Sequence, residues 1–282
     1  MDPTPGNKFY FSSTNYLNYR VIGNGKRKII FLHGFGSSHR TWDDILPYLM
    51  LSNSQLIFFD LIGAGFSSKQ KISDYSMVAN AKAISKYLKD NHIIDFTLIG
   101  HSFGGGVALL STIKMRHDSD ITPSSLILID PAAYKTKLPF FIKNLTIPII
   151  SRSILNLINI KLQARFTLEK LYYDKSKVTD EKVERYAYFM SLQGHDRTLM
   201  ETAKQIIPEN LSRYTQQYDS FEMPVLVLWG RNDNVIDIEF GRKLSDEIPN
   251  GKLTVIENCG HIPQEEQPEI TAYEINSFLK QL

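Results

Sequence analysis

Short runs of consecutive apolar residues alternate along the chain with segments in which apolar residues recur every three or four positions. The apolar runs are 28–32, 56–59, 96–99, 126–129, 225–229 and 253–256. A strand that is apolar on both faces is buried on both sides, and its alternation with helices is typical of a parallel sheet. An alternating, aromatic segment at 8–21 predicts a β-hairpin at the sheet edge. The sequence therefore predicts an α/β fold with a mostly parallel sheet of about eight strands.

Helical spacing of apolar residues predicts the helices that flank this sheet. The predicted helices are 41–50, 76–91, one that begins just after the run 96–99, 239–248 and 268–282. Helices of this kind pack one apolar face against the sheet. Both faces of the sheet are therefore expected to be covered.

The alternation of strands and helices stops after Pro131, the end of the sixth predicted strand. From 132 to 218 no clear buried strand occurs, and apolar residues follow helical spacing instead. We therefore divide the chain into a first core part at 1–131, a helical cap at 132–218 and a second core part at 219–282. Some apolar side chains of the cap are expected to line a substrate pocket, although each could equally belong to the core of the cap. These candidates are Phe140, Phe141, Met190 and Leu199.

Composition narrows the possible ligands. The 282 residues carry 32 basic and 30 acidic side chains, a net charge of +2, which does not favour a nucleic-acid partner. Cys259 is the single cysteine, so the chain can form no intramolecular disulfide or cysteine-based metal cluster. The histidines and carboxylates show no dense metal-ligand spacing, and the Gly63-Ala64-Gly65 loop lacks the third glycine of a dinucleotide site. We expect no metal and no cofactor.

The sequence also gives expectations for the location and assembly of the protein. No apolar signal segment precedes residue 8, which favours a cytoplasmic protein. The apolar stretch 138–162 is interrupted by charged residues and by Pro148, so a membrane span is not expected. A homodimer is compatible with the composition.

The run 96–99 leads into the pattern GHSFG at 100–104, and a segment of small and then apolar residues continues past Met115 without a helix breaker. This order predicts a strand, a very tight turn and a helix, with Ser102 at the turn. A serine hydroxyl becomes a nucleophile when it is held clear of the backbone beside a base and close to N–H donors. The stretch resembles the nucleophile elbow of the α/β-hydrolase family, and the resemblance implies that Ser102 is the nucleophile.

The base should lie on a loop at the carboxyl edge of the sheet, within reach of the serine. His261 follows the predicted strand 253–256, and the sequence CGHIP at 259–263 resembles the histidine loop of the family. His101 adjoins Ser102, but side chains of neighbouring elbow residues are expected to point apart. The remaining candidates are expected at the surface (His39, His92 and His117), in the loop after the first buried strand (His33) or in the cap (His195).

The resemblance also implies an acid and an oxyanion hole. Asp233 directly follows the run 225–229, where the acid of the family usually stands, and the order serine, acid, histidine matches the family. Asp130 is the reserve acid, since some relatives use that position, and Asp237 is a weaker reserve. The oxyanion of a tetrahedral intermediate needs two N–H donors. We expect the first from the backbone of Phe103.

The second donor is expected after the first buried strand. The sequence HGFG at 33–36 resembles the His-Gly loop of the family, in which the next residue donates, here Phe35. The combined resemblance implies a capped α/β hydrolase that cleaves a carboxylic ester of a small hydrophobic acyl substrate.

Other activities remain open on the same three residues. Amidase, thioesterase, lactonase and C–C bond hydrolase chemistry all use this arrangement. The C–C hydrolases typically carry Asn at the position of His101 and Trp at the position of Ile262, which disfavours that activity. A different class, a ligand-binding receptor with a slow or vestigial triad, also resembles this pattern.

Overall fold

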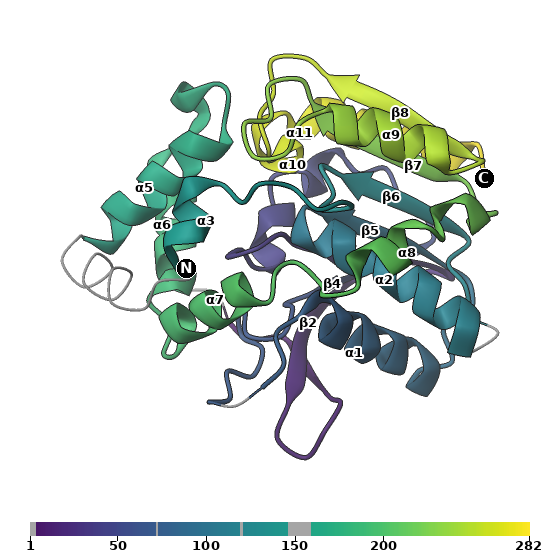
Figure 1. Cartoon of the computed structure of the whole chain (residues 1–282), viewed down its shortest axis with the longest axis horizontal. Helices are drawn as coiled ribbons and strands as arrows, with labels where there is room; N and C mark the ends of the chain where they lie inside the picture. Colours follow the sequence, from purple (N-terminus) through teal and green to yellow (C-terminus); the bar gives the residue numbers. More distant parts are fainter. Residues whose placement is uncertain (1–3, 72, 119–120, 146–158) are drawn as a thin grey trace.

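The computed structural model describes residues 4–71, 73–118, 121–145 and 159–282, which form an eight-stranded sheet with helices around it (Figure 1). The strand order is β1-β2-β4-β3-β5-β6-β7-β8. Strands β1 and β2 form an antiparallel edge hairpin, β2 is antiparallel to β4, and all other pairs are parallel. The strands are β1 (Asn7–Tyr10), β2 (Tyr16–Ile22), β3 (Arg27–Leu32), β4 (Ser54–Phe59), β5 (Phe96–His101), β6 (Ser125–Ile129), β7 (Val225–Gly230) and β8 (Gly251–Ile256). The predicted α/β fold with its mostly parallel sheet is confirmed.

Each central strand is buried on both faces because its alternate side chains enter two different cores. In β3, Ile30 and Leu32 belong to the same buried cluster as side chains of helices α1 (Met77–Asp90), α2 (Phe103–Asp118) and α9 (Glu239–Glu247). Ile29 and Phe31, one position away in each case, pack with α11 (Pro268–Lys280) on the opposite face. This alternation explains why the strands read as continuous apolar runs.

The predicted helix over 41–50 is wrong. The structure has two separate 3₁₀ turns there, η1 (His39–Trp42) and η2 (Leu46–Tyr48). Pro47 has no N–H group to donate to the preceding turn, so an α-helix cannot continue through it. Trp42 and Ile45 are nevertheless buried on the α11 face of the sheet, as their apolar character requires.

The described residues between β6 and β7 form helices joined by turns and loops, with no strand among them. Helices α5, α6 and α7 stand beside the sheet in Figure 1, with α3 among them. The elements of this insert are α3 (Phe140–Leu145), α5 (Ile160–Leu171), η3 (Lys175–Lys177), α6 (Asp180–Met190), α7 (His195–Lys204), α8 (Leu211–Thr215) and η4 (Tyr218–Ser220). A further short helix, α10 (Pro263–Glu266), precedes α11. No helix in the described part of the chain combines the length and hydropathy needed to cross a membrane.

A buried carboxylate joins the edge hairpin to the loop after β4. Asp60 is fully buried and accepts hydrogen bonds from the backbone N–H and Nδ1 of His39, from Asn18 Nδ2 and from the Phe66 N–H, at 2.7–2.9 Å. His39 was expected at the surface, and this expectation is wrong, since only 4% of it is exposed. A buried ionised carboxylate requires several donors, and these donors come from three separate parts of the chain.

Protonation of Asp60 in acid should lower the free energy of unfolding. Burial alone would raise the pKa of its carboxyl, but the charge and hydrogen bonds of His39 and the charge of His33 outweigh burial and lower the pKa from 3.8 to about 2. A carboxyl with a lowered folded-state pKa contributes stability above pH 3.8, and this is lost as the pH falls through about 2. The shift corresponds to about 2 kcal/mol. Urea unfolding between pH 5 and pH 2.5 should show a smaller acid-dependent loss for Asp60→Asn than for the wild type, and equal losses would contradict this assignment.

Candidate active site

Ser102 lies at the sharp turn between β5 and α2, with a backbone φ of 51°. Few residues other than glycine adopt this region, so the turn must be held by its surroundings. The Ser102 N–H donates to Ile129 O of β6 at 2.9 Å, and the Ser102 carbonyl accepts from the N–H groups of Gly106 and Ala132 at 3.1 and 2.9 Å. These bonds to β6 and to the chain just beyond it fix the serine at the carboxyl edge of the sheet.

The two glycines that flank the turn lie where a side chain has no room. A Cβ atom on Gly100 would lie 2.4 Å from the Gly104 carbonyl oxygen, and one on Gly104 would lie 2.4 Å from the Leu32 carbonyl oxygen. Contacts this short with backbone atoms cannot be relieved by rotating a side chain. The helix α2 can therefore start directly against β3 and β5 only because both positions lack a side chain.

The structure brings Ser102, His261 and Asp233 together in one hydrogen-bonded chain. His261 Nε2 lies 2.9 Å from Ser102 Oγ, and His261 Nδ1 lies 2.7 Å from Asp233 Oδ2. The carboxylate accepts a hydrogen bond from Nδ1–H, which leaves Nε2 as the acceptor for the serine hydroxyl. The other oxygen of Asp233 accepts from the N–H groups of Val235 and Ile236 at 2.7 and 3.1 Å. An activated serine requires this geometry.

Asp130, the reserve acid, lies beside this hydrogen-bonded chain but makes different contacts. It is fully buried, has a φ of 42°, and accepts a hydrogen bond from the Gly230 N–H at 3.0 Å. One polar atom each of Asp130, Asp233 and His261 lies within 4.8 Å of the others. Burial, and then the charge of Asp233, raise the pKa of the Asp130 carboxyl well above its usual value. Of the two neighbouring carboxyls, Asp233 contacts the imidazole, while Asp130 accepts the Gly230 N–H.

The other reserve acid and the remaining histidines take different places. Asp237 is exposed and accepts a hydrogen bond from the Glu239 N–H near the start of α9. His101 stays within the site, because its Nε2 donates to the His261 carbonyl oxygen at 2.7 Å. Burial holds the pKa of His101 well below its usual value, so this imidazole is neutral. Sequence reasoning missed this contact, since it depends on a residue 160 positions away.

Two backbone N–H groups are available beside Ser102. Phe103 is the first residue of α2, where N–H groups lack a partner within the helix. Phe35 lies in the loop after β3, and within the described chain its N–H donates no backbone hydrogen bond outside helices and strands. Both residues line the same cavity as Ser102 and His261. The two residues expected to form an oxyanion hole therefore share this cavity with the serine.

A cavity of about 640 Å³ opens at Ser102, between the sheet and the helical insert. Met190 and Leu199, two of the four predicted pocket residues, line it. The side chains of Phe140 and Phe141 lie outside the described residues. The other lining side chains are mostly apolar and include Leu138, Ile142, Leu162, Phe166, Ile206 and Val235. Sequence reasoning did not select these six, although the spacing of Leu162 and Phe166 places them on one face of a helix.

Two polar side chains of the insert also line the cavity. Tyr186 lies on α6, four residues before Met190. His195 begins α7 and is 5% exposed, and burial lowers the pKa of its imidazole to about 4. Both side chains are uncharged at neutral pH, so this part of the cavity wall carries no net charge.

Comparison with known proteins agrees with the geometry. Residues 28–268 match the family described as the alpha/beta hydrolase fold. The chain is 24% identical over 281 residues to the uncharacterized hydrolase YugF of Bacillus subtilis, with 98% of each chain covered. It is 27% identical over 267 residues to the monoacylglycerol lipase ABHD6 of Mus musculus, covering 90% of this chain and 76% of the lipase. An alpha/beta hydrolase fold protein from Burkholderia ambifaria has a similar structure, with a TM-score of 0.83, 21% identity and coverage of 96% and 97% of the two chains.

The two carboxyls beside His261 should differ in their effect on the reactivity of Ser102. A fluorophosphonate should add once to Ser102 in the wild type, since it reacts with an activated serine. Asp233→Asn should slow this labelling by a factor on the order of 10⁴, because an amide favours the wrong imidazole tautomer. Asp130→Asn should change the rate only a few-fold. Intact and peptide mass spectrometry would measure both rates, and the opposite ranking would identify Asp130 as the acid.

Burial of the Asp130 carboxyl should make the free energy of unfolding decrease as the pH rises. Its folded-state pKa lies well above 3.8, so above pH 3.8 the unfolded chain ionises this carboxyl while the folded protein does not. The unfolded state then binds fewer protons, and stability decreases up to the folded-state pKa. Asp130→Asn removes this penalty, so its unfolding free energy relative to wild type should increase between pH 3.5 and pH 7. The exposed Asp237→Asn should show no such trend, and a constant difference for Asp130→Asn would contradict the assignment.

Proposed function

The chain belongs to the alpha/beta hydrolase fold family, and from this premise we propose that it hydrolyses a carboxylic ester with a hydrophobic acyl group. The observation that carries the proposal is the Ser102 Oγ–His261 Nε2 contact of 2.9 Å, located in a largely apolar cavity of about 640 Å³. Similarity to a monoacylglycerol lipase of Mus musculus and to Lipase 3 of Moraxella supports a substrate with an acyl chain.

In the proposed mechanism, His261 removes the hydroxyl proton of Ser102 as Oγ attacks the acyl carbon. The backbone N–H groups of Phe35 and Phe103 donate to the oxyanion of the tetrahedral intermediate. Asp233 stabilises the imidazolium through Nδ1. Imidazolium then protonates the leaving alcohol, and an acyl group remains on Ser102.

In the second half of the reaction, water replaces Ser102 Oγ as the nucleophile. His261 takes a proton from water, and the resulting hydroxide attacks the acyl carbon of the acyl-enzyme. The same two N–H groups hold the second oxyanion, and the proton on His261 returns to Ser102 Oγ as the acid leaves. The bond between the acyl carbon and Ser102 Oγ breaks as the carbonyl group re-forms, and the free enzyme is restored.

The wall of the cavity supports an acyl group larger than acetyl. Burial of each methylene contributes about 0.8 kcal/mol, provided that the pocket accommodates it. Extending the acyl chain by two methylenes should therefore raise kcat/KM by about tenfold until the pocket is full.

A series of p-nitrophenyl esters from acetate through octanoate tests this proposal, with Ser102→Ala as the blank. We expect kcat/KM to rise from acetate to hexanoate and Ser102→Ala to reduce turnover to the uncatalysed rate. A flat or falling series would favour a small or polar substrate. Absence of turnover on every ester, with Ser102 still labelled by fluorophosphonate, would favour a ligand-binding receptor.

A further inference from the structure

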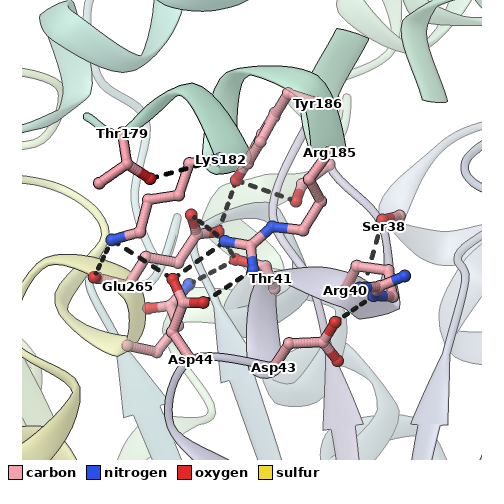
Figure 2. Close-up of polar contacts among 12 residues, drawn as sticks. Ser38, Arg40, Thr41, Asp43, Asp44, Thr179, Lys182, Arg185, Tyr186 and Glu265 are labelled. Atoms are coloured by element: carbon pink, nitrogen blue, oxygen red, sulfur yellow. Dashed lines mark hydrogen bonds and ion pairs between the residues drawn. The ribbon is translucent and has the colours of Figure 1, made fainter. Parts of the chain in front are cut away.

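A cluster of polar side chains joins helix α6 of the insert to the core of the protein next to the histidine loop. We call it the Glu265 cluster, and Figure 2 shows Lys182, Arg185 and Tyr186 extending from one helix toward Asp44 and Glu265. Its members lie in η1 or just after it, directly after α5, in α6 and in α10. They are Thr41, Asp44, Tyr172, Lys182, Arg185, Tyr186 and Glu265.

Glu265 is the centre of the cluster, and its side chain is fully buried. Its Oε1 accepts hydrogen bonds from the hydroxyl groups of Thr41 and, at 2.7 Å, Tyr186. Its Oε2 accepts from the Tyr172 hydroxyl and from Arg185 Nη2, both at 3.1 Å. Four donors saturate the carboxylate, so each of them is fixed in position relative to α10.

The charges of the cluster balance. Arg185 makes a bidentate pair with Asp44, with Nη1–Oδ1 and Nη2–Oδ2 distances of 2.8 and 3.0 Å, and its side chain is 8% exposed. Lys182 lies 3.3 Å from Asp44 Oδ2 and donates to the Glu265 carbonyl oxygen at 2.7 Å. Two cations and two anions therefore share a mostly buried site, and loss of one member leaves another without its partner.

Tyr186 connects the cluster to the cavity. Its ring lines the cavity, while its hydroxyl donates to Glu265 and lies 3.4 Å from Ser37 Oγ. Ser37 is in the same loop as Phe35, and Glu265 lies four residues after His261. One phenol group thus touches the loop that carries an expected oxyanion donor and the helix that follows the expected base.

The same helix presents a second cavity residue. Met190 is four residues after Tyr186, so the two side chains share one face of α6, and both line the cavity. The position of α6 relative to Ser102 therefore sets the shape of this wall. The ion pairs and hydrogen bonds that hold α6 come from the Glu265 cluster.

We propose that Glu265 is a positioning residue that, through Tyr186, fixes the α6 wall of the cavity and thereby sets the preference for longer acyl groups. The inference rests on the proposed function for the identity of the substrate. Glu265 itself does not line the cavity, so its effect passes through Tyr186 and Arg185.

The test compares matched replacements at Glu265. Glu265→Leu keeps the approximate volume but accepts no hydrogen bond. Glu265→Gln retains one carbonyl acceptor, and its amide group can donate to the hydroxyls of Thr41 and Tyr186 after these rotate. Glu184→Gln is the control, because Glu184 lies on the same helix but forms only an exposed ion pair with Lys161.

The readout is the ratio of kcat/KM for p-nitrophenyl hexanoate to that for p-nitrophenyl acetate. We expect Glu265→Leu to lower this ratio at least about fivefold, Glu265→Gln to restore most of it and Glu184→Gln to leave it unchanged. Loss of folded protein would reduce both rates equally and leave the ratio intact. An unchanged ratio in folded Glu265→Leu would overturn the inference. If Glu265→Leu does not fold, Tyr186→Phe keeps the ring and removes only the bridging hydroxyl, and the same ratio decides.

A binding measurement separates this inference from the proposed function. Calorimetric titration of p-nitrophenyl hexanoate and acetate into Ser102→Ala measures the preference without turnover, and Ser102→Ala/Glu265→Leu should lose that preference. If the wild type hydrolyses no ester but the double variant loses the preference, the proposed function fails and the inference stands. If the wild type hydrolyses esters and the double variant keeps the preference, the inference fails alone. No binding of hexanoate to Ser102→Ala would overturn it as well.

Discussion

The positive φ of Ser102 is the constraint on which the site depends. A backbone angle of 51° at a residue with a Cβ atom is unfavourable by itself, and it persists because β5, β6 and α2 hold it from several sides. Ser102 bonds to Ile129 O and to the N–H of Ala132, so β6 and the chain just beyond it brace the turn. The parallel register of β5 with β6 therefore positions the hydroxyl, and the absence of side chains at Gly100 and Gly104 lets the helix start there.

The histidine loop is held in place by hydrogen bonds that involve the helical insert. The buried carboxylate of Glu266 accepts from the N–H groups of Gly260, Tyr173 and Asp174, at 2.7–3.2 Å. The His261 N–H donates to the carbonyl oxygen of Leu171, at the end of α5. The loop that carries the imidazole and the segment after α5 therefore form one hydrogen-bonded unit. This insert does more than cover the cavity, because it also supplies part of the backbone that orients the expected base.

The sequence predicted those features that depend on local patterns. Apolar runs located the parallel strands, and GHSFG located the turn at Ser102, because strand burial and tight turns have short-range signatures. Local patterns did not predict the polar contacts between residues far apart in the sequence. His39 was expected at the surface, yet it binds Asp60, and the contact of His101 with the His261 carbonyl was not predicted. The partners of these two side chains lie 21 and 160 positions away in the sequence, so a local pattern cannot predict the contacts.

Asp130 and Asp233 are adjacent carboxyls that differ in the number of hydrogen-bond donors around them. Asp233 receives two backbone N–H groups on one oxygen and the imidazole on the other, so its anion has three donors. Asp130 receives the single N–H of Gly230 in a fully buried position, where a second negative charge would be repelled by the first. Both residues follow sheet strands, and the sequence favoured Asp233 with Asp130 in reserve. Donor count and direct contact with the imidazole therefore favour Asp233 over Asp130 as the proposed acid beside His261.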